Sequence, residues 1–393
     1  MKALDLFAGT GWGVACKALG IDEEGVEIMP EAVATREANG MKTIYNDVWE
    51  GLDHAPRDYD LLIASPPCQT FSMAGNGAGR RALSDVLAAV ESGVYTDPAA
   101  LRALAETLDP RTALVLTPLA HVYRDRPRLV AFEQVPTVLP VWEACADVMR
   151  GFGYHVKTAV LNAEQYGVPQ TRKRAILVAR LDGEVKLPEP THSRYYSRDP
   201  ERLDPGVLPW VSMAEAIGWG MTHRPYYTVT AGASTADNKH TGGTEPSLLG
   251  GKPAREAVKR ELAEGRWLDG DHDTSPESWN GIGPNLKLTV DEAAALQSYP
   301  PYVAFTGNNK LAHQSRRPLS HPAPTITAGH DSSNRGFLTE DGELTVATVE
   351  EVSALQSYPR PFVWKGAKTK QFLQIGNAVP PLLAEAVLRS LTA

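Results

Sequence analysis

The sequence predicts an α/β protein, with a Rossmann-like doubly wound domain and a smaller, loop-rich region. Two observations carry this prediction. In the first half of the chain, short apolar runs alternate with helical patterns, which is typical of a parallel sheet covered by helices on both faces. After about Leu187, Pro, Gly, His, Trp and Tyr become frequent, and periodic patterns are scarce until Asp291. This change indicates a second region of irregular structure, which is either a recognition region or a tolerated insertion.

The expected strands and helices follow one another along the first half of the chain. Strands are expected at Lys2 to Phe7, Gly25 to Ile28, Leu61 to Ala64, Leu129 to Glu133, His155 to Leu161 and Arg174 to Val178. Helices are expected at Trp12 to Leu19, Pro30 to Ala38 and Val141 to Arg150, and a helical pattern returns from Leu344 and ends with Pro381 to Leu391. Because such sheets bind ligands at the carboxyl ends of their strands, polar motifs at these ends are candidates for a site.

Composition limits the class of protein. Of the 393 residues, 42% are hydrophobic and 22% are charged, which is typical of a soluble globular protein. No apolar run approaches the roughly 18 residues that a membrane span needs, and the N-terminus enters an apolar strand instead of a signal peptide. We therefore expect a cytoplasmic protein that does not contact a membrane. The net charge of −8 counts mildly against a nucleic-acid partner, but it does not exclude a local basic cleft.

The three cysteines, Cys16, Cys68 and Cys145, include no CxxC pair. This number and spacing argue against a disulfide framework and against a zinc site, so no metal is expected. Cys16 and Cys145 fall in helix-like stretches, where a cysteine acts as a small buried hydrophobe. Cys68 lies in Ser65-Pro-Pro-Cys-Gln-Thr-Phe-Ser72, directly after a predicted strand. Backbone amides at that strand end would favour a reactive thiolate, whereas a buried structural cysteine is the alternative.

A glycine-rich turn, Asp5-Leu-Phe-Ala-Gly-Thr-Gly-Trp-Gly13, follows the first strand and precedes a helix. Glycines let the backbone approach a ligand closely, and a helix N-terminus favours an anionic group. Glu27, at the end of the next strand, can accept hydrogen bonds from ribose hydroxyls. Asp47 ends the third strand–helix repeat of the predicted sheet and could accept a hydrogen bond from an adenine amino group. Nucleotide, flavin and adenosylmethionine sites all use such a turn, so this motif alone leaves the cofactor open.

Two further polar motifs lie at predicted strand ends. Phe132-Glu133-Gln134-Val135-Pro136 places a carboxylate after an apolar strand, where Glu133 could act as an acid or as a hydrogen-bond partner. Tyr166-Gly-Val-Pro-Gln-Thr-Arg-Lys-Arg174 places two arginines two residues apart at the start of a strand. Strand alternation would direct Arg172 and Arg174 to the same face, although a solvated basic turn is the alternative.

The second half of the chain contains an internal echo. Arg224–Gly232 resembles His321–Gly329, and the Leu-Gln-Ser-Tyr-Pro of Leu296–Pro300 recurs as Leu355–Pro359. The first copy carries a much longer insert, from Ala233 to Lys287. Such an echo indicates a duplication in which only one copy kept its original function.

Taken together, the motifs and their order resemble the DNA cytosine-5 methyltransferase family. The FxGxG motif matches Phe7–Gly11, the proline-cysteine motif matches Pro67-Cys68-Gln69, and the Glu-Asn-Val motif matches Glu133-Gln134-Val135 with one departure. The QxRxR motif matches Gln170–Arg174 and the GNAVP motif matches Gly376–Pro380. The resemblance covers residues 1 to about 180 and 320 to 393. At position 134, Gln keeps the amide of the family's Asn, so altered backbone bracing is expected there and not lost chemistry.

The resemblance implies a division of the chain and a set of site residues. Residues 1–188 and 331–393 would form the S-adenosyl-L-methionine-dependent catalytic domain, and 189–330 the target-recognition domain. Our hypothesis is that the insert from Ala233 to Lys287 carries the contacts that read bases. Cofactor binding is implied for Phe7, Gly9, Gly11, Glu27, Ile28, Asp47, Pro66 and Asn377. Catalysis is implied for Cys68, Glu133, Arg172 and Arg174. DNA contacts are implied for Gln69, Ser72, Arg80 and Arg81.

The resemblance also implies a mechanism and partners. Cys68 would add to carbon 6 of a cytosine flipped out of duplex DNA, while Glu133 holds the ring and Arg172 contacts O2 or orients Glu133. Arg174 would make a supporting phosphate or pocket contact. The implied partners are double-stranded DNA and a cognate restriction endonuclease, and monomeric action suits an enzyme that reads one base at a time.

Three alternative functions remain open at this point. One is the tRNA-directed branch of the same family, which shares the cysteine and the glutamate. Another is a catalytically silent DNA-binding relative, which the intact Cys68, Glu133, Arg172 and Asn377 disfavour. A dehydrogenase would also use the glycine-rich turn, but nothing else in the chain supports nicotinamide chemistry.

Overall fold

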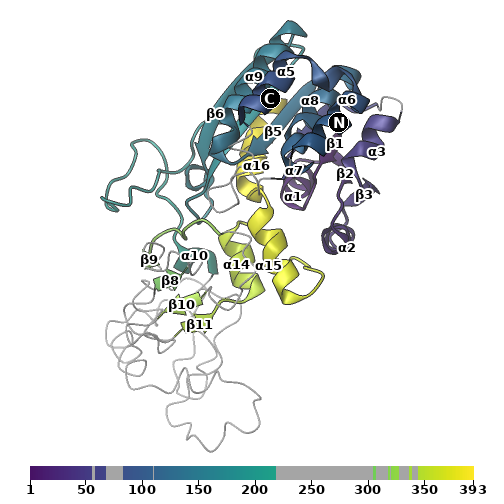
Figure 1. Ribbon diagram of the computed structural model, residues 1–393. Coiled ribbons are helices and arrows are strands. Elements are labelled where there is room, and N and C mark those ends of the chain that lie inside the picture. Colours follow the sequence, from purple (N-terminus) through teal and green to yellow (C-terminus); the bar gives the residue numbers. More distant parts are fainter. Residues whose placement is uncertain are drawn as a thin grey trace, which may run out of the picture. The chain divides into compact units, whose positions relative to one another are not determined.

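The computed structural model (Figure 1) describes two compact units of the chain. The described residues are 1–54, 58–67, 83–108, 110–217, 304–306, 317–318, 320–326, 336–338 and 344–393. Unit 1 consists of Met1–Trp210, Thr325–Ser332 and Thr348–Ala393, and unit 2 of Val211–Pro324 and Ser333–Ala347. The functional division at residues 188 and 331 stays a prediction, because the two units reflect packing and not target recognition.

Unit 1 contains a seven-stranded sheet in the order β3-β2-β1-β4-β5-β7-β6. Its strands are β1 (Lys2–Leu6), β2 (Asp22–Val26), β3 (Lys42–Tyr45), β4 (Leu61–Ala64), β5 (Leu129–Gln134), β6 (His155–Asn162) and β7 (Lys173–Arg180). The first five strands pair in parallel, and β7 runs antiparallel to both β5 and β6. The predicted α/β class is therefore confirmed, with an antiparallel edge on a doubly wound sheet.

Helices cover both faces of this sheet. The helices of unit 1 are α1 (Gly11–Ala18), α2 (Pro30–Ala38), α3 (Val48–Asp53), α5 (Leu83–Glu91), α6 (Pro98–Thr107), α7 (Pro110–Ala113), α8 (Thr117–Asp125), α9 (Leu139–Gly151), α14 (Val349–Leu355), α15 (Lys368–Asn377) and α16 (Pro381–Thr392). Because neighbouring strand residues face opposite sides, Leu61 packs with Trp12 of α1 and Leu388 of α16, whereas Leu62 packs with Trp142 of α9. Helices α1 and α16 thus lie together on one face (Figure 1).

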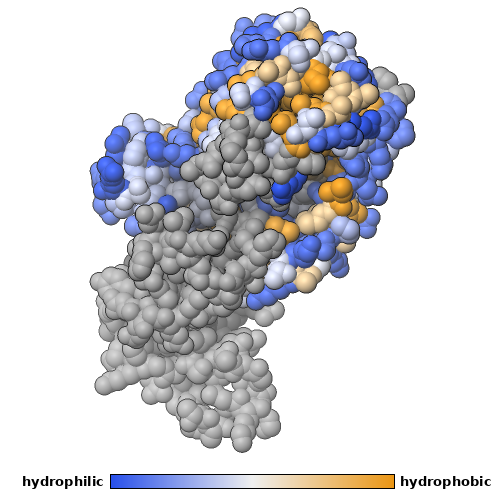
Figure 2. Space-filling view, viewed as in Figure 1, coloured by the Kyte–Doolittle hydropathy of each residue, from blue (hydrophilic) through white to orange (hydrophobic). Residues whose placement is uncertain are grey.

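The surface of unit 1 is mixed in character. On the face shown in Figure 2, hydrophilic residues border the described part, and apolar residues gather over the region where Figure 1 places α5, α6 and α8. Within the described ranges, no helix has the length and apolar composition of a membrane span.

Two elements differ from the sequence-based expectation. Strand β2 begins at Asp22 and ends at Val26, three residues before the expected start and two before the expected end. The return of helical structure begins at Val349 and not at Leu344, because Leu344–Val346 form strand β11. Thr348 then starts α14 with a capping box, in which its hydroxyl accepts from the Glu351 amide and the Glu351 carboxylate accepts from the Thr348 amide.

Unit 2 is described in part. It contains α10 (Met213–Ile217) and a four-stranded antiparallel sheet in the order β11-β10-β8-β9. The strands are β8 (Ala304–Thr306), β9 (Arg317–Pro318), β10 (Gly336–Leu338) and β11 (Leu344–Val346). The hypothetical base-reading insert, Ala233 to Lys287, and the first Leu-Gln-Ser-Tyr-Pro copy lie outside the described residues.

Candidate functional site

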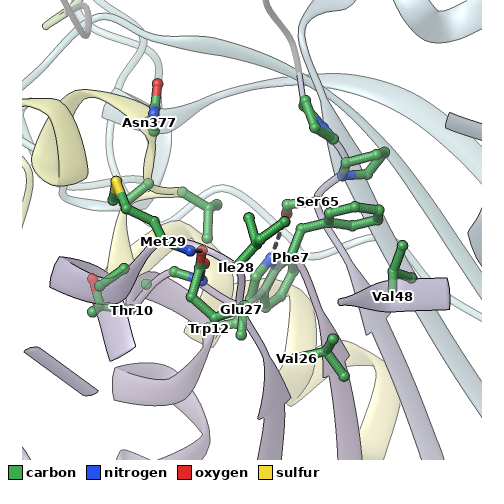
Figure 3. Close-up of a pocket in the computed structure, with 18 of the residues that line it drawn as sticks. Phe7, Thr10, Trp12, Val26, Glu27, Ile28, Met29, Val48, Ser65 and Asn377 are labelled. Carbon is green, nitrogen blue, oxygen red and sulfur yellow. Dashed lines mark hydrogen bonds between the residues drawn. The ribbon is translucent and has the colours of Figure 1, made fainter. Parts of the chain in front are cut away.

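A cavity of about 410 Å³ lies in unit 1 at the carboxyl ends of the parallel strands (Figure 3). Its volume is within the range of roughly 300–1,000 Å³ that is usual for ligand pockets. The described residues that line it come from segments 7–12, 26–29, 46–49, 65–67, 133–134 and 373–379, together with Leu114, Ala32 and Arg174. The position agrees with the rule that open α/β sheets bind ligands at this edge.

The glycine-rich turn between β1 and α1 forms one wall of the cavity. Phe7 and Gly9 have φ values of 57° and 46°, in the left-handed region. Gly11 is required for a different reason, because a Cβ at this position would overlap the carbonyl oxygen of Val379. The turn and the GNAVP motif are therefore in direct backbone contact, although they are far apart in the sequence.

We expect Gly11→Ala to lower the free energy of unfolding by about 1–3 kcal/mol, the usual cost of an overpacked buried position. Neither the backbone of Val379 nor the start of α1 can move freely to admit a methyl group. Urea unfolding measures the change. The matched control is Gly151→Ala at the end of α9, where no heavy atom lies within 4 Å of the added Cβ. If both variants were as stable as the parent protein, the close approach at Gly11 would be refuted.

A buried ion pair supports the turn from the core. The Arg36 guanidinium donates to Glu23 Oε1 at 2.6 Å and to the Gly9 carbonyl at 3.1 Å. Gly25 makes room for it, since a Cβ there would overlap the guanidinium. Burial, with a further contribution from the Glu23 charge, raises the pKa of Asp5 well above its usual range.

Glu27, Asp47 and Ile28 line a second wall of the cavity. Glu27 accepts from the amides of Gly9 and Met29, each at 2.8 Å, and its oxygens retain further acceptor capacity. Asp47 caps α3 by accepting from the Trp49 amide at 3.0 Å. Ile28 is 70% exposed and lines the cavity, so it offers an apolar surface for a flat ring.

All eight residues that the sequence predicts for cofactor binding line this cavity. They are Phe7, Gly9, Gly11, Glu27, Ile28, Asp47, Pro66 and Asn377. The sequence reasoning did not identify Thr10, Trp12, Trp49 or Gln374, which also line it. Each of these four residues lies inside a motif or within two residues of one, so its place near the site could have been inferred from the sequence. The Trp12 indole donates to Ser65 Oγ at 2.9 Å (Figure 3).

Glu133 and Arg174 form a buried ion pair in the cavity wall. Arg174 Nε lies 2.6 Å from Glu133 Oε1, and both residues are buried. The pairing follows from topology, because β5 and β7 are neighbours and Glu133 stands opposite Ile176 in the ladder. A carboxylate held in this way is fixed in orientation, which suits it to bind a polar ring edge.

Arg172 has different partners from Arg174. It is buried and donates to the carbonyl of Ile326 at 2.8 Å and to those of Gly376 and Ala378 at 3.0 and 3.1 Å. It therefore fastens the GNAVP segment to the strand that carries Arg174. The predicted contact of Arg172 with a base oxygen stays a prediction.

Gln134 braces the strand end that leads to Cys68. Its side-chain amide donates to the Pro66 carbonyl, and its Oε1 accepts from the Val135 amide at 2.5 Å. Pro66 and Pro67 line the cavity. Cys68 itself, with Gln69, Ser72, Arg80 and Arg81, lies outside the described residues.

The two described cysteines are buried and free. Burial raises the pKa of the Cys145 thiol to about 12 and moves the pKa of the Cys16 thiol above that of an ordinary cysteine. Both are thus neutral thiols at physiological pH, and neither is a nucleophile. Over the described ranges, no group of three His, Cys, Asp or Glu is arranged to hold a metal ion.

Known proteins resemble this chain over most of its length. A sequence model of the C-5 cytosine-specific DNA methylase family matches residues 1–90 and 102–393. The type II methyltransferase M1.HphI of Haemophilus parahaemolyticus is 29% identical over 98% of this chain and 84% of its own. M.AplI of Arthrospira platensis, also a type II methyltransferase, is 26% identical over 99% of this chain and 85% of its own.

One solved structure from E. coli resembles the fold. It is described as a DNA modification methyltransferase encoded within a prophage, and the match covers 100% of this chain and 98% of that one. The TM-score is 0.52 and the sequence identity is 17%, so the likeness concerns the fold alone.

Proposed function

The chain belongs to the C-5 cytosine-specific DNA methylase family, and from this premise we propose that it transfers a methyl group from S-adenosylmethionine to a flipped cytosine in a specific duplex sequence. The observation that carries the proposal is the composition of one cavity wall. The Glu133–Arg174 ion pair and the prolines that lead directly to Cys68 line the same cavity as the glycine-rich turn. Methyl transfer to a pyrimidine requires a nucleophile, a ring-holding carboxylate and a methyl donor within one site.

The described lining residues fit the chemistry of S-adenosylmethionine. Glu27 and Asp47 offer carboxylate oxygens to ribose hydroxyls and to an adenine amino group, and Ile28 offers an apolar surface to the purine ring. With Glu133, the described lining has three carboxylates against the one guanidinium of Arg174, a balance that favours a cationic sulfonium. When bound, this cofactor supplies an electrophilic methyl group.

The remaining chemistry belongs to the side chains of this protein. Carbon 5 of cytosine is a poor nucleophile, so the Cys68 thiolate adds to carbon 6, and the electron density at carbon 5 rises. The Glu133 carboxyl group accepts from the exocyclic amino group and, in its protonated form, donates to N3, which stabilises the negative charge that develops on the ring. After carbon 5 has been methylated, it gives up its proton to solvent water. The electron pair of that bond re-forms the double bond between carbons 5 and 6, and Cys68 leaves carbon 6 as a thiolate.

The two arginines have different partners, which supports a different role for each. Arg174, 2.6 Å from Glu133, orients the carboxylate that faces the base. Arg172 acts through backbone carbonyls and keeps the GNAVP segment against the glycine-rich turn. The faces of carbon 5 and carbon 6 are covered in a stacked duplex, so the cytosine must leave the helix, with Gln69, Ser72, Arg80 and Arg81 as the proposed DNA contacts.

Sequence readout is assigned to residues 189–330, by resemblance to the family. The relatives named above are type II methyltransferases, so a cognate restriction endonuclease with the same target is the expected partner. We propose that the protein acts as a monomer, because one catalytic pocket serves one flipped base.

The proposed function is tested by methyl transfer from labelled S-adenosylmethionine to unmethylated duplex DNA, followed by bisulfite sequencing of the product. We expect protected cytosines in one recurring sequence context. Protection at all cytosines would refute sequence specificity. If the folded, cofactor-bound protein transferred no methyl group to DNA but methylated tRNA, the DNA substrate would be wrong, and transfer to neither would indicate a catalytically silent protein.

A further inference from the structure

A buried hydroxyl pair connects the cavity to the C-terminal part of unit 1. Thr10 Oγ1 and Tyr358 Oη lie 2.6 Å apart, across 348 positions of sequence. Tyr358 belongs to the second Leu-Gln-Ser-Tyr-Pro copy, and Thr10 lies in the glycine-rich turn and lines the cavity. Both residues are buried, and burial raises the pKa of Tyr358 above its usual range, so its hydroxyl is protonated.

Tyr358 is held rigidly in place. Its ring centroid lies 4.8 Å from those of Phe362 and Trp364, which are 4.7 Å from each other. Trp364 in turn donates from its indole to Ser353 Oγ at 3.1 Å. The Tyr358 hydroxyl is thus presented to Thr10 by a packed aromatic cluster and not by a flexible side chain.

Thr10 occupies the N-cap position of α1, but it does not cap the helix. A threonine in this position usually accepts a hydrogen bond from an amide of the first turn. Thr348 does so at the start of α14, whereas Thr10 makes no side-chain cap bond. Its backbone has φ −138° and ψ −21°, which differs from the extended conformation of Thr348.

The missing cap leaves amides of α1 available at the cavity. The first amides of an α-helix have no intrahelical acceptor, and they attract anionic groups. Gly11 and Trp12, in the first turn of α1, line the cavity. If S-adenosylmethionine binds here as proposed, the group that suits these amides is the carboxylate of its amino-acid end.

We infer that Tyr358 is a positioning residue: its hydroxyl holds Thr10 away from the capping conformation, so that the first turn of α1 can bind the carboxylate end of the cofactor. The inference rests on the proposed function. It assigns to the second Leu-Gln-Ser-Tyr-Pro copy a role in cofactor affinity. Without the Tyr358 hydroxyl, Thr10 would satisfy the α1 amides itself and compete with the ligand.

The test compares two ligands that differ at the amino-acid end. S-adenosylhomocysteine carries the carboxylate, and methylthioadenosine keeps the adenosine and the thioether without it. We expect Tyr358→Phe to weaken S-adenosylhomocysteine binding by about 10-fold, the effect of losing a hydrogen bond to a charged group, and to change methylthioadenosine binding by less than about twofold. Calorimetric titration of the full chain measures both affinities. In turnover, KM for the methyl donor should rise while kcat changes little.

A second substitution separates capping from general damage. Alanine cannot cap, so adding Thr10→Ala to Tyr358→Phe should restore most of the S-adenosylhomocysteine affinity, whereas structural damage from two substitutions would accumulate. The matched control is Tyr154→Phe, which removes a buried hydroxyl that donates to the Pro127 carbonyl at 2.6 Å, and it should bind like the parent protein.

Several results would overturn the inference. Equal losses for the two ligands, or a double variant no better than Tyr358→Phe, would show that the hydroxyl pair only supports the fold. Full affinity in Tyr358→Phe would show that it has no role. If the parent protein bound neither ligand, the proposed cofactor would fail first and the inference with it.

Discussion

Replacing Cys68 with alanine is expected to lower methyl transfer on the order of 10⁴-fold or more, as in other covalent catalysts that lose their nucleophile. No other described cysteine can take over this role. Burial raises the pKa of the Cys145 thiol to about 12, and Cys16 is buried as well, so neither supplies a thiolate. Transfer of labelled methyl groups to duplex DNA measures the loss.

Cofactor binding should survive the same substitution. Cys68 follows Pro66 and Pro67, which line the cavity, and alanine fits the same backbone without new bulk. Calorimetric titration with S-adenosylhomocysteine should therefore give an affinity within about threefold of the parent protein, a difference below 1 kcal/mol. The matched control is Cys145→Ala, which removes a buried thiol far from the proposed chemistry and should keep its turnover. Substantial residual transfer in Cys68→Ala would remove the covalent step from the mechanism.

The sequence predicted the parallel core of the fold better than its edge. Strands β1, β4 and β5 are mostly apolar runs, so the sequence predicts that they are buried on both faces. Strand β2 was expected too late, because Asp22, Glu23 and Glu24 do not look like a buried strand. Glu23 is buried only because Arg36 pairs with it at 2.6 Å, and a pair between residues 13 positions apart on different elements leaves no periodic signal.

The same distinction applies to the site. Motifs that are contiguous in sequence placed eight residues around one cavity. Most of these motifs follow a strand of the sheet, whereas Asn377 ends helix α15. The partners of these residues were not predictable in the same way. From the sequence, Arg172 was expected to contact O2 or to orient Glu133, and Arg174 to make a supporting contact. In the structure Arg174 pairs with Glu133, and Arg172 binds backbone carbonyls. The Thr10–Tyr358 pair depends on tertiary packing alone, so nothing local to either residue indicates it.

Replacing Glu133 with glutamine is expected to lower kcat by about 10²-fold or more, by analogy with the loss of one preorganised transition-state partner. Glutamine keeps the shape and one acceptor oxygen, so the base can still be bound. It lacks an acidic proton that can pass to N3 as Cys68 adds to carbon 6. KM for DNA should therefore change less than kcat, which single-turnover measurements at saturating DNA would establish.

Glu133→Gln can also destabilise the fold, because it removes the carboxylate that pairs with the buried Arg174. Breaking a buried pair costs about 3–5 kcal/mol in other proteins, so urea unfolding must first show that the variant is folded under assay conditions. Arg174→Lys separates the two effects: it keeps the positive charge but loses the planar fork that orients Glu133, and we expect a smaller loss of kcat than in Glu133→Gln. The surface control is Glu143→Gln on α9, where an exposed carboxylate is removed. A near-normal kcat in folded Glu133→Gln would exclude Glu133 from the chemistry, and the ion pair would then serve only to hold β5 against β7.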